Sequence, residues 1–139
     1  MANSQALLSL LSATVTTAVT ADVTAGVVRM PNARVESLTL QAIFTYGSGG
    51  TNATAYVQTT FDGGTTWMDI ACFQFTTATA KRLFHLTAAA VTSIATPGDA
   101  ALTANTCVNG FLGDQFRVKL TTTGTYAGGT TFAITAMPK

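Results

Sequence analysis

The sequence predicts an all-β fold, an antiparallel β-sandwich of jelly-roll type preceded by an N-terminal extended arm. Threonine makes up about a fifth of the 139 residues, and β-branched residues suit the pleated surface of a sheet. Strand-like runs recur about every ten residues between glycine-rich turns, which is typical of sandwiches and jelly rolls. No alternation of strands with helices is visible. We therefore expect an arm over residues 1–30 and one sandwich domain over residues 31–139.

The N-terminal segment has a pattern of its own. Its leucines follow the i, i+3, i+4 spacing of a helix, but only for one or two turns, which is too short for a helix that is stable alone. Residues 13–24 carry valines among threonine and alanine with no clear period, as in an extended arm or an edge strand. The segment either packs on its own domain or reaches a neighbouring subunit. The candidate interface residues for the second alternative are Leu7, Leu8, Leu10, Leu11, Val15, Val19 and Arg29.

A half-buried strand is predicted after Val35, because apolar residues alternate there with polar ones. Its inward face would carry Leu38, Leu40, Ala42, Phe44 and Tyr46. The glycine-rich residues 47–50 end this strand.

A hairpin gives the clearest local signal. The strand-like runs 55–61 and 67–75 flank a turn whose glycines can adopt positive φ and whose aspartate can accept hydrogen bonds from the turn amides. The tryptophan after the turn is expected to anchor it against the core. Both faces of the second strand are apolar, so we expect a central strand covered on both sides. The predicted hairpin residues are Asp62, Gly63, Gly64, Thr66 and Trp67.

The C-terminal half yields three further predictions. Residues 81–86 form a short strand, and residues 87–106, which are rich in alanine and threonine, form a long loop with room for one strand. Residues 116–120 and 132–136 then alternate on either side of a glycine-rich turn. A second hairpin is therefore predicted to end the domain.

Composition argues against several function classes. Charged residues make up 9% of the chain, against about 25% in typical domains, and the formal net charge is +1. A nucleic-acid-binding protein would be expected to carry a basic stripe, whereas Lys and Arg are dispersed here apart from Lys81 and Arg82. No signal-peptide pattern opens the chain, and no apolar run approaches the ~20 residues that span a bilayer. We expect no nucleic-acid or membrane partner, and synthesis in a cytoplasm.

The reactive side chains suggest no chemistry. Cys72 and Cys107 are expected to be buried free thiols, and their distance from one another is left open. His85, the only histidine, is far from both cysteines in sequence, so we expect no metal and no other cofactor. Asp62 and Asp69 could pair as in glycoside hydrolysis, but the turn accounts for Asp62 and an exposed strand position for Asp69. The chain is therefore not expected to be an enzyme.

The segment Thr60-Phe61-Asp62-Gly63-Gly64-Thr65-Thr66-Trp67 resembles the Asp-box of sialidases and other propellers. In those proteins the box is a repeated structural hairpin remote from catalysis. It occurs once here, in a chain too short for a propeller. The resemblance therefore implies only the local conformation of the turn.

A second resemblance extends from about Val35 to Met137. It rests on the order of four segments, Ser37-Leu38-Thr39-Leu40-Gln41-Ala42, Ala55-Tyr56-Val57-Gln58-Thr59-Thr60 with its hairpin, Leu112-Gly113-Asp114-Gln115-Phe116-Arg117-Val118, and Phe132-Ala133-Ile134-Thr135. In this order the chain resembles small structural proteins of tailed bacteriophages. The resemblance implies a jelly-roll capsid decoration or cement protein on the capsid exterior, with the major capsid protein as partner and self-association as a dimer or trimer.

Two alternatives remain open. The first is a tail, neck or fibre-base component of the same kind of particle. The second is a glycan-binding module displayed on it, for which Tyr46, Tyr56 and Tyr126 are the candidate contact residues.

Overall fold

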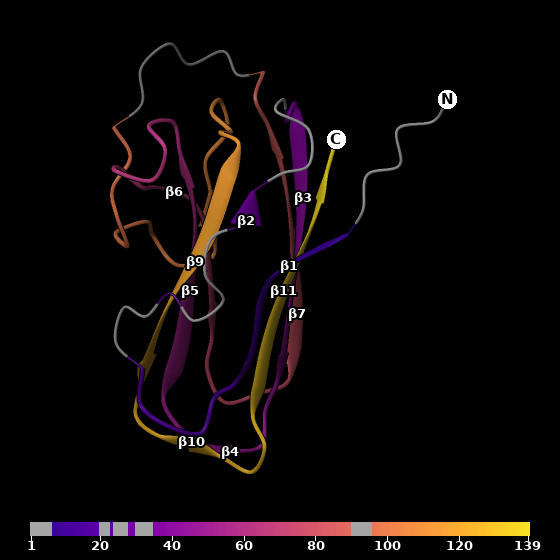
Figure 1. The fold of residues 1–139 in the computed structure, drawn as a ribbon. Coiled ribbons are helices and arrows are strands. Elements are labelled where there is room, and N and C mark those ends of the chain that lie inside the picture. The colour runs from indigo at the N-terminus through magenta and orange to yellow at the C-terminus, as the bar shows by residue number, and fades with distance from the viewer. Residues whose placement is uncertain (1–6, 20–22, 24–27, 30–34, 90–95) are drawn as a thin grey trace.

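A computed structural model describes residues 7–19, 23, 28–29, 35–89 and 96–139. These residues form an all-β fold, in which antiparallel sheets pack face to face as in a β-sandwich (Figure 1). The predicted all-β sandwich is thus confirmed, whereas the jelly-roll connectivity stays a prediction. The strands are β1 (Leu8–Thr14), β2 (Val28–Arg29), β3 (Ser37–Thr45), β4 (Ser48–Gly49), β5 (Asn52–Thr60), β6 (Met68–Phe75), β7 (Ala80–Thr87), β8 (Thr106–Cys107), β9 (Gln115–Thr123), β10 (Tyr126–Ala127) and β11 (Thr131–Pro138).

Two main sheets make up the sandwich. One has the strand order β1-β11-β3-β7 and the other has the order β2-β9-β5-β6-β8. A short ribbon of β10 and β4 joins the two layers at the lower end in Figure 1. The core lies between the sheets because inward-facing residues alternate along each long strand. Its largest apolar side chains include Phe44, Phe73, Phe116 and Phe132, all fully buried.

Two predicted strands and the first hairpin are confirmed. β3 buries Leu38, Leu40, Ala42 and Phe44 in strict alternation, and β7 pairs with it antiparallel. β5 and β6 form the predicted hairpin around the turn at residues 61–67. Between Val57 and Gln58 the pairing shifts by a β-bulge. β6 lies between β5 and β8 and is buried along most of its length, as its apolar faces predicted.

The helical spacing of the N-terminal leucines was misleading, because residues 8–14 form strand β1. This strand pairs antiparallel with β11, and the pairing is shifted between Ser9 and Leu11. Such a bulge lets the successive residues Leu10 and Leu11 both enter the core, where each is at most 1% exposed. Two adjacent inward leucines break the period of two, which is why the segment did not look like a strand.

The predicted second hairpin is wrong. β9 pairs with β5 and β2 in one sheet, whereas β11 pairs with β1 and β3 in the other. The glycine-rich connection between β9 and β11 crosses from one layer to the other and pairs with β4 through β10 on the way. Alternating strands around a glycine-rich turn are common to hairpins and to such crossings, so the sequence pattern could not separate them.

The connection after β7 agrees with the predicted long loop over its described part. Residues 96–105 contain no strand, and the short strand β8 at Thr106–Cys107 follows and pairs with β6. Residues 90–95 lie outside the described residues.

Candidate functional site

The turn at residues 60–67 is closed by its own polar groups. The Thr60 hydroxyl donates to Asp62 Oδ1 at 2.9 Å and accepts from Gly64 N at 3.1 Å. The Thr66 N–H donates to Asp62 Oδ1 at 2.7 Å, and the Trp67 indole donates to Gly64 O at 3.0 Å. Bonds from the Thr66 backbone and hydroxyl stabilise the ionised Asp62 carboxylate and lower its pKa. All these groups are used within the turn.

Positive φ at Gly63 and Gly64, 73° and 103°, fits the glycine requirement of the turn. Trp67 is 8% exposed and lies under the Arg117 guanidinium, 4.4 Å from the ring centroid. The Asp-box residues therefore form a closed structural unit that joins the hairpin to strand β9.

A polar network, which the sequence did not reveal, covers the outer face of the five-stranded sheet. The Gln58 side-chain amide donates from Nε2 to Asp69 Oδ1 at 2.8 Å and to Asp99 Oδ1 at 2.6 Å. Arg117 Nε donates to Gln58 Oε1 at 2.7 Å, and Lys119 Nζ donates to Asp99 Oδ1 at 2.7 Å. Three strands and the loop before β8 thus meet in one cluster.

Asp69 is the centre of this cluster and is buried, at 1% exposed, although an exposed strand position had been expected. Its Oδ1 accepts from Ala100 N at 2.8 Å, and its Oδ2 accepts from Ala101 N at 2.7 Å and Leu102 N at 3.1 Å. Its own N–H donates to Gly98 O at 2.9 Å. The side chain therefore holds the loop of residues 98–102 against the sheet, whereas Asp62 is bonded within its own turn.

Burial and neighbouring charges shift the pKa of both Asp99 and Arg117 in this network. Burial disfavours ionisation of Asp99, but hydrogen bonds from Lys119 and Gln58 and the charges of Lys119 and Arg117 outweigh it and lower the Asp99 pKa. Burial lowers the Arg117 pKa, against the opposing effect of the Asp99 and Asp69 charges. Throughout the described residues, buried side-chain polar atoms all have hydrogen-bond partners. The buried polar groups of the network are therefore all bonded within the protein.

The two cysteines are close along the paired strands but lie on opposite faces of the sheet. Cys72 is paired with Thr106, whereas Cys107 is paired with Ala71. Because successive residues of a strand point to opposite faces, the two thiols point away from one another. Both are free, and burial raises the pKa of Cys72 to about 11. The prediction of free thiols is confirmed, and Cys72 is buried while Cys107 is half-buried.

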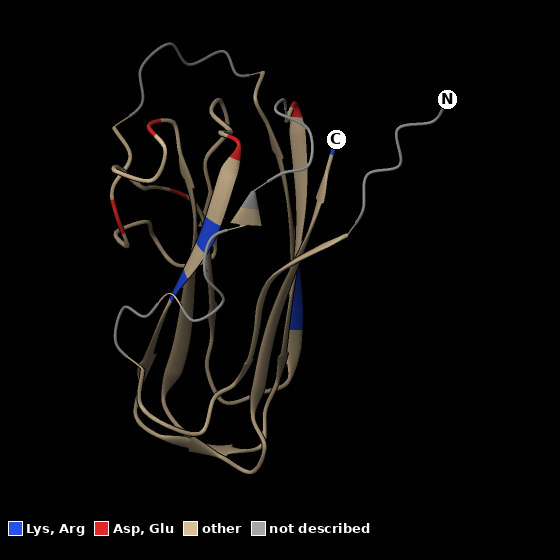
Figure 2. Ribbon diagram, viewed as in Figure 1, with Lys and Arg blue, Asp and Glu red and all other residues tan. Residues whose placement is uncertain are grey.

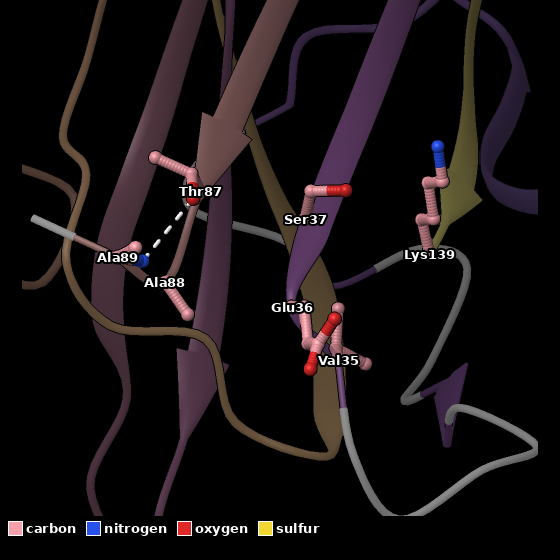
Figure 3. Close-up of a pocket in the computed structure, with 7 residues that line it drawn as sticks. All are labelled: Val35, Glu36, Ser37, Thr87, Ala88, Ala89 and Lys139. Carbon is pink, nitrogen blue, oxygen red and sulfur yellow. Dashed lines mark hydrogen bonds between the residues drawn. The ribbon is translucent and has the colours of Figure 1, made fainter.

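A pocket of about 610 Å³ lies where the ends of β3, β7 and β11 meet. Figure 3 shows its lining, with Ala89 N donating to Thr87 Oγ1 at 3.1 Å across one wall. The ionisable side chains of this lining are Glu36 and Lys139. Ser37 and Thr87 add hydroxyl groups to the same lining.

The outer face of the four-stranded sheet is different in character, and we call it the open face. Its outward residues on β3 and β11 are mainly threonine and small or apolar side chains, with Ile43 41% and Met137 38% exposed. On β7, Leu83 is 62% exposed. Figure 2 shows Lys and Arg along β7, where Lys81 and Arg82 are placed, and at the C-terminus just after β11. The signal that could have revealed this face is Ile43, an apolar residue at an outward position between two buried ones.

The predicted arm residues divide between the core and the surface. Leu10, Leu11 and Val15 are buried in the core, and Leu8 and Val19 pack against it. Of the two alternatives, the described part of the segment therefore packs on its own domain. Leu7 is exposed, and Arg29 pairs through its backbone with Gln115 in the other sheet. Contact of the predicted arm residues with another subunit stays a prediction.

The three tyrosines do not form a common platform for a glycan. Tyr126 is 1% exposed and its hydroxyl donates to Thr76 O at 2.7 Å. Tyr46 lies against it, with ring centroids 6.2 Å apart, and donates to Gly49 O at 3.0 Å. Tyr56 is separate from this pair, in the middle of β5 beside Cys72.

The described residues contain no group of three or more His, Cys, Asp or Glu that is placed to hold a metal ion. They also contain no helix long and apolar enough to cross a membrane.

The comparisons with known proteins agree with one another. No family model matches this chain, and no curated protein and no solved structure is significantly similar to it.

Proposed function

We propose that this protein is a non-enzymatic structural component of a virion, a capsid decoration or cement protein. It would bind the outer face of a tailed-phage head and stabilise contacts between major capsid subunits. In this proposal it is made in the host cytoplasm and ends on the capsid exterior. The observation that carries the proposal is the open face, which is almost free of charge and exposes Ile43, Leu83 and Met137.

Such a face suits permanent contact with another protein. Apolar side chains set among threonine methyl groups lose water at little electrostatic cost, because few charges must be desolvated. An interface on the order of 1,000 Å² on each copy, repeated over a symmetric shell, would turn a modest affinity into stable coverage. Behind the face, β3 is paired along its whole length with β11 and β7, and a buried apolar core supports the sheet.

Co-sedimentation of the purified protein with empty, undecorated heads tests this proposal. We expect saturable binding near a fixed ratio to the capsid subunit. The double substitution Ile43→Glu and Met137→Glu should lower occupancy at least tenfold, because two charges would then be buried against the capsid. Phe61→Glu is the matched control, since Phe61 is 59% exposed on the turn at one end of the sandwich.

Wild-type protein that fails to bind heads would overturn the proposal. Recovery of the protein in tail or neck fractions would instead support the alternative of a tail, neck or fibre-base component. A glycan-binding module is less well supported, because Tyr46 and Tyr126 are engaged with each other and with backbone carbonyls rather than lined up with Tyr56.

A further inference from the structure

Strand β7 presents a long free edge. β7 is the last strand in the order β1-β11-β3-β7, so one of its sides has no neighbouring strand. It has 8 residues, whereas the outermost strands of the other sheet, β2 and β8, have 2 each. A long edge presents a row of unpaired N–H and C=O groups that can pair with another strand.

Two sets of hydrogen bonds show which groups point outward on this edge. Thr87 N donates to Asn109 Oδ1 at 2.8 Å and Thr87 O accepts from Gly110 N at 2.9 Å, so the Thr87 backbone faces away from β3. Ser37, opposite Thr87, bonds through its backbone to Lys139 and thus also faces away from β7. Because this direction alternates along an antiparallel pair, the outward groups are those of Lys81, Leu83 and His85.

These three residues define an open window in the edge. Residues 109–110 already occupy the edge at Thr87, and the strand begins at Ala80. Within the described residues no hydrogen bond reaches the outward backbone groups of Lys81, Leu83 or His85. The window is centred on Leu83, and its six outward backbone groups have no hydrogen-bond partner among the described residues.

We propose that a second copy of this chain pairs with this window, β7 against β7, antiparallel about a two-fold axis at Leu83. A window centred on one residue is self-complementary, because rotation about that residue maps each free group onto a free group. Leu83 then faces Leu83 of the second copy, and Lys81 faces His85 of the second copy. All six groups are paired, and the pairing ends where residues 109–110 begin.

The side chains fit the same register. Arg82 comes opposite Phe84 of the second copy, which places a guanidinium beside an aromatic ring. Both side chains already lie by aromatic rings in their own chain, Arg82 5.4 Å from the Phe75 centroid and Phe84 4.8 Å from the Phe73 centroid. On the open face, the exposed Leu83 side chains of the two copies cover one another. The two four-stranded sheets become one continuous sheet.

The contact is small, so the dimer should be weak, with a dissociation constant on the order of 10–500 μM. Sedimentation equilibrium of the purified chain up to about 1 mM measures it. Leu83→Pro should yield a monomer of unchanged circular dichroism, since proline removes an N–H that points away from β3. Leu83→Ala is its partner variant, which keeps the backbone donor and should retain most of the dimer. A monomeric wild type, or a Leu83→Pro protein that dimerises like the wild type, would overturn the inference.

A charge change tests the register and does not depend on the proline variant folding. His85→Glu places a carboxylate opposite Lys81 of the second copy twice per dimer, and should tighten association roughly 2- to 30-fold at low salt. His85→Gln is the matched control and should not tighten it. The double variant Lys81→Glu with His85→Lys should behave like His85→Glu. If His85→Glu, His85→Gln and the double variant dimerise with the same affinity, the proposed register is wrong.

This inference goes beyond the proposed function and does not rest on it. Dimerisation is measured without heads, and Met137→Glu, on β11 and separated from β7 by β3, should leave it unchanged. A loss of head binding with an intact dimer, or the reverse, would therefore separate the two proposals.

Discussion

The outer face of the five-stranded sheet lies under residues 96–105, and its polar side chains bond to one another and to that loop. The open face of the four-stranded sheet has no such cover among the described residues and carries threonine and exposed apolar side chains. The same sandwich thus has one face whose polar groups are satisfied internally and one face whose groups remain for water or a partner. We therefore expect substitutions on the first face to affect stability most, whereas the second is the face that we propose for binding.

The largest effect should come from removing the carboxylate that fastens the covered face. Asp69→Ala leaves the N–H groups of Ala100, Ala101 and Leu102 without their acceptor. It also removes one of the two acceptors of the Gln58 amide. Losing one partner of a buried charged cluster costs about 3–5 kcal/mol, so the free energy of unfolding measured in urea should fall by that amount. Thr135→Ala on the open face is the control and should change it by less than about 0.5 kcal/mol. If both substitutions lower the free energy of unfolding equally, the two faces do not differ in their contribution to stability.

A smaller effect is expected from pH. The folded pKa of Asp99 is below its ordinary value of 3.8, so its ionised form contributes stability above that value. This contribution is lost as the pH falls below 3.8 through the folded pKa. Asp99→Asn should therefore unfold with a shallower dependence on pH in this acid range, as followed by urea denaturation at a series of pH values. The Asp99 side chain is 48% exposed, so the difference should be modest.

Protonation of Asp62 should also lower stability in acid, because its pKa is lowered as well. The acid dependence of Asp99→Asn is therefore compared with that of Asp62→Asn and of the double variant. A double variant with the same acid dependence as the wild type would show that neither carboxylate carries it.

The smallest effect concerns the open face itself. Ile43→Thr replaces one outward β-branched residue by another, beside Ala133 and Lys81 on the neighbouring strands. The free energy of unfolding should stay within about 0.5 kcal/mol of the wild type, because no buried contact is lost. A thermal unfolding scan checks this. A large loss would mean that Ile43 is needed for folding and would remove it as evidence for a binding face.

The fold was predictable wherever one strand carried its own signal. The alternation at residues 38–44 and the turn at Asp62–Trp67 each specify a local structure, and both are as expected. The errors concern what a strand pairs with. Two successive inward leucines at a bulge looked helical, and a crossing between sheets looked like a hairpin, since pairing partners lie far apart in sequence and leave no local mark.

The polar network was missed for the same reason. Gln58, Asp69, Asp99 and Arg117 come from four separate segments, and none has a distinctive neighbour in sequence. The sequence did contain one signal for the network. Arg117 and Lys119 lie two residues apart on one strand, in a chain with very few charges. That spacing indicated a shared face, but the loop that supplies Asp99 could be placed there only by the structure.

Strand β1, near the start of the chain, pairs along its length with β11, which ends at Pro138. During synthesis, residues 8–14 therefore leave the ribosome long before their partner exists. Until β11 has emerged, Leu10 and Leu11 have no sheet to enter and remain available to chaperones or to other nascent chains. The edge that closes the sandwich can form only after translation of the described chain is nearly complete.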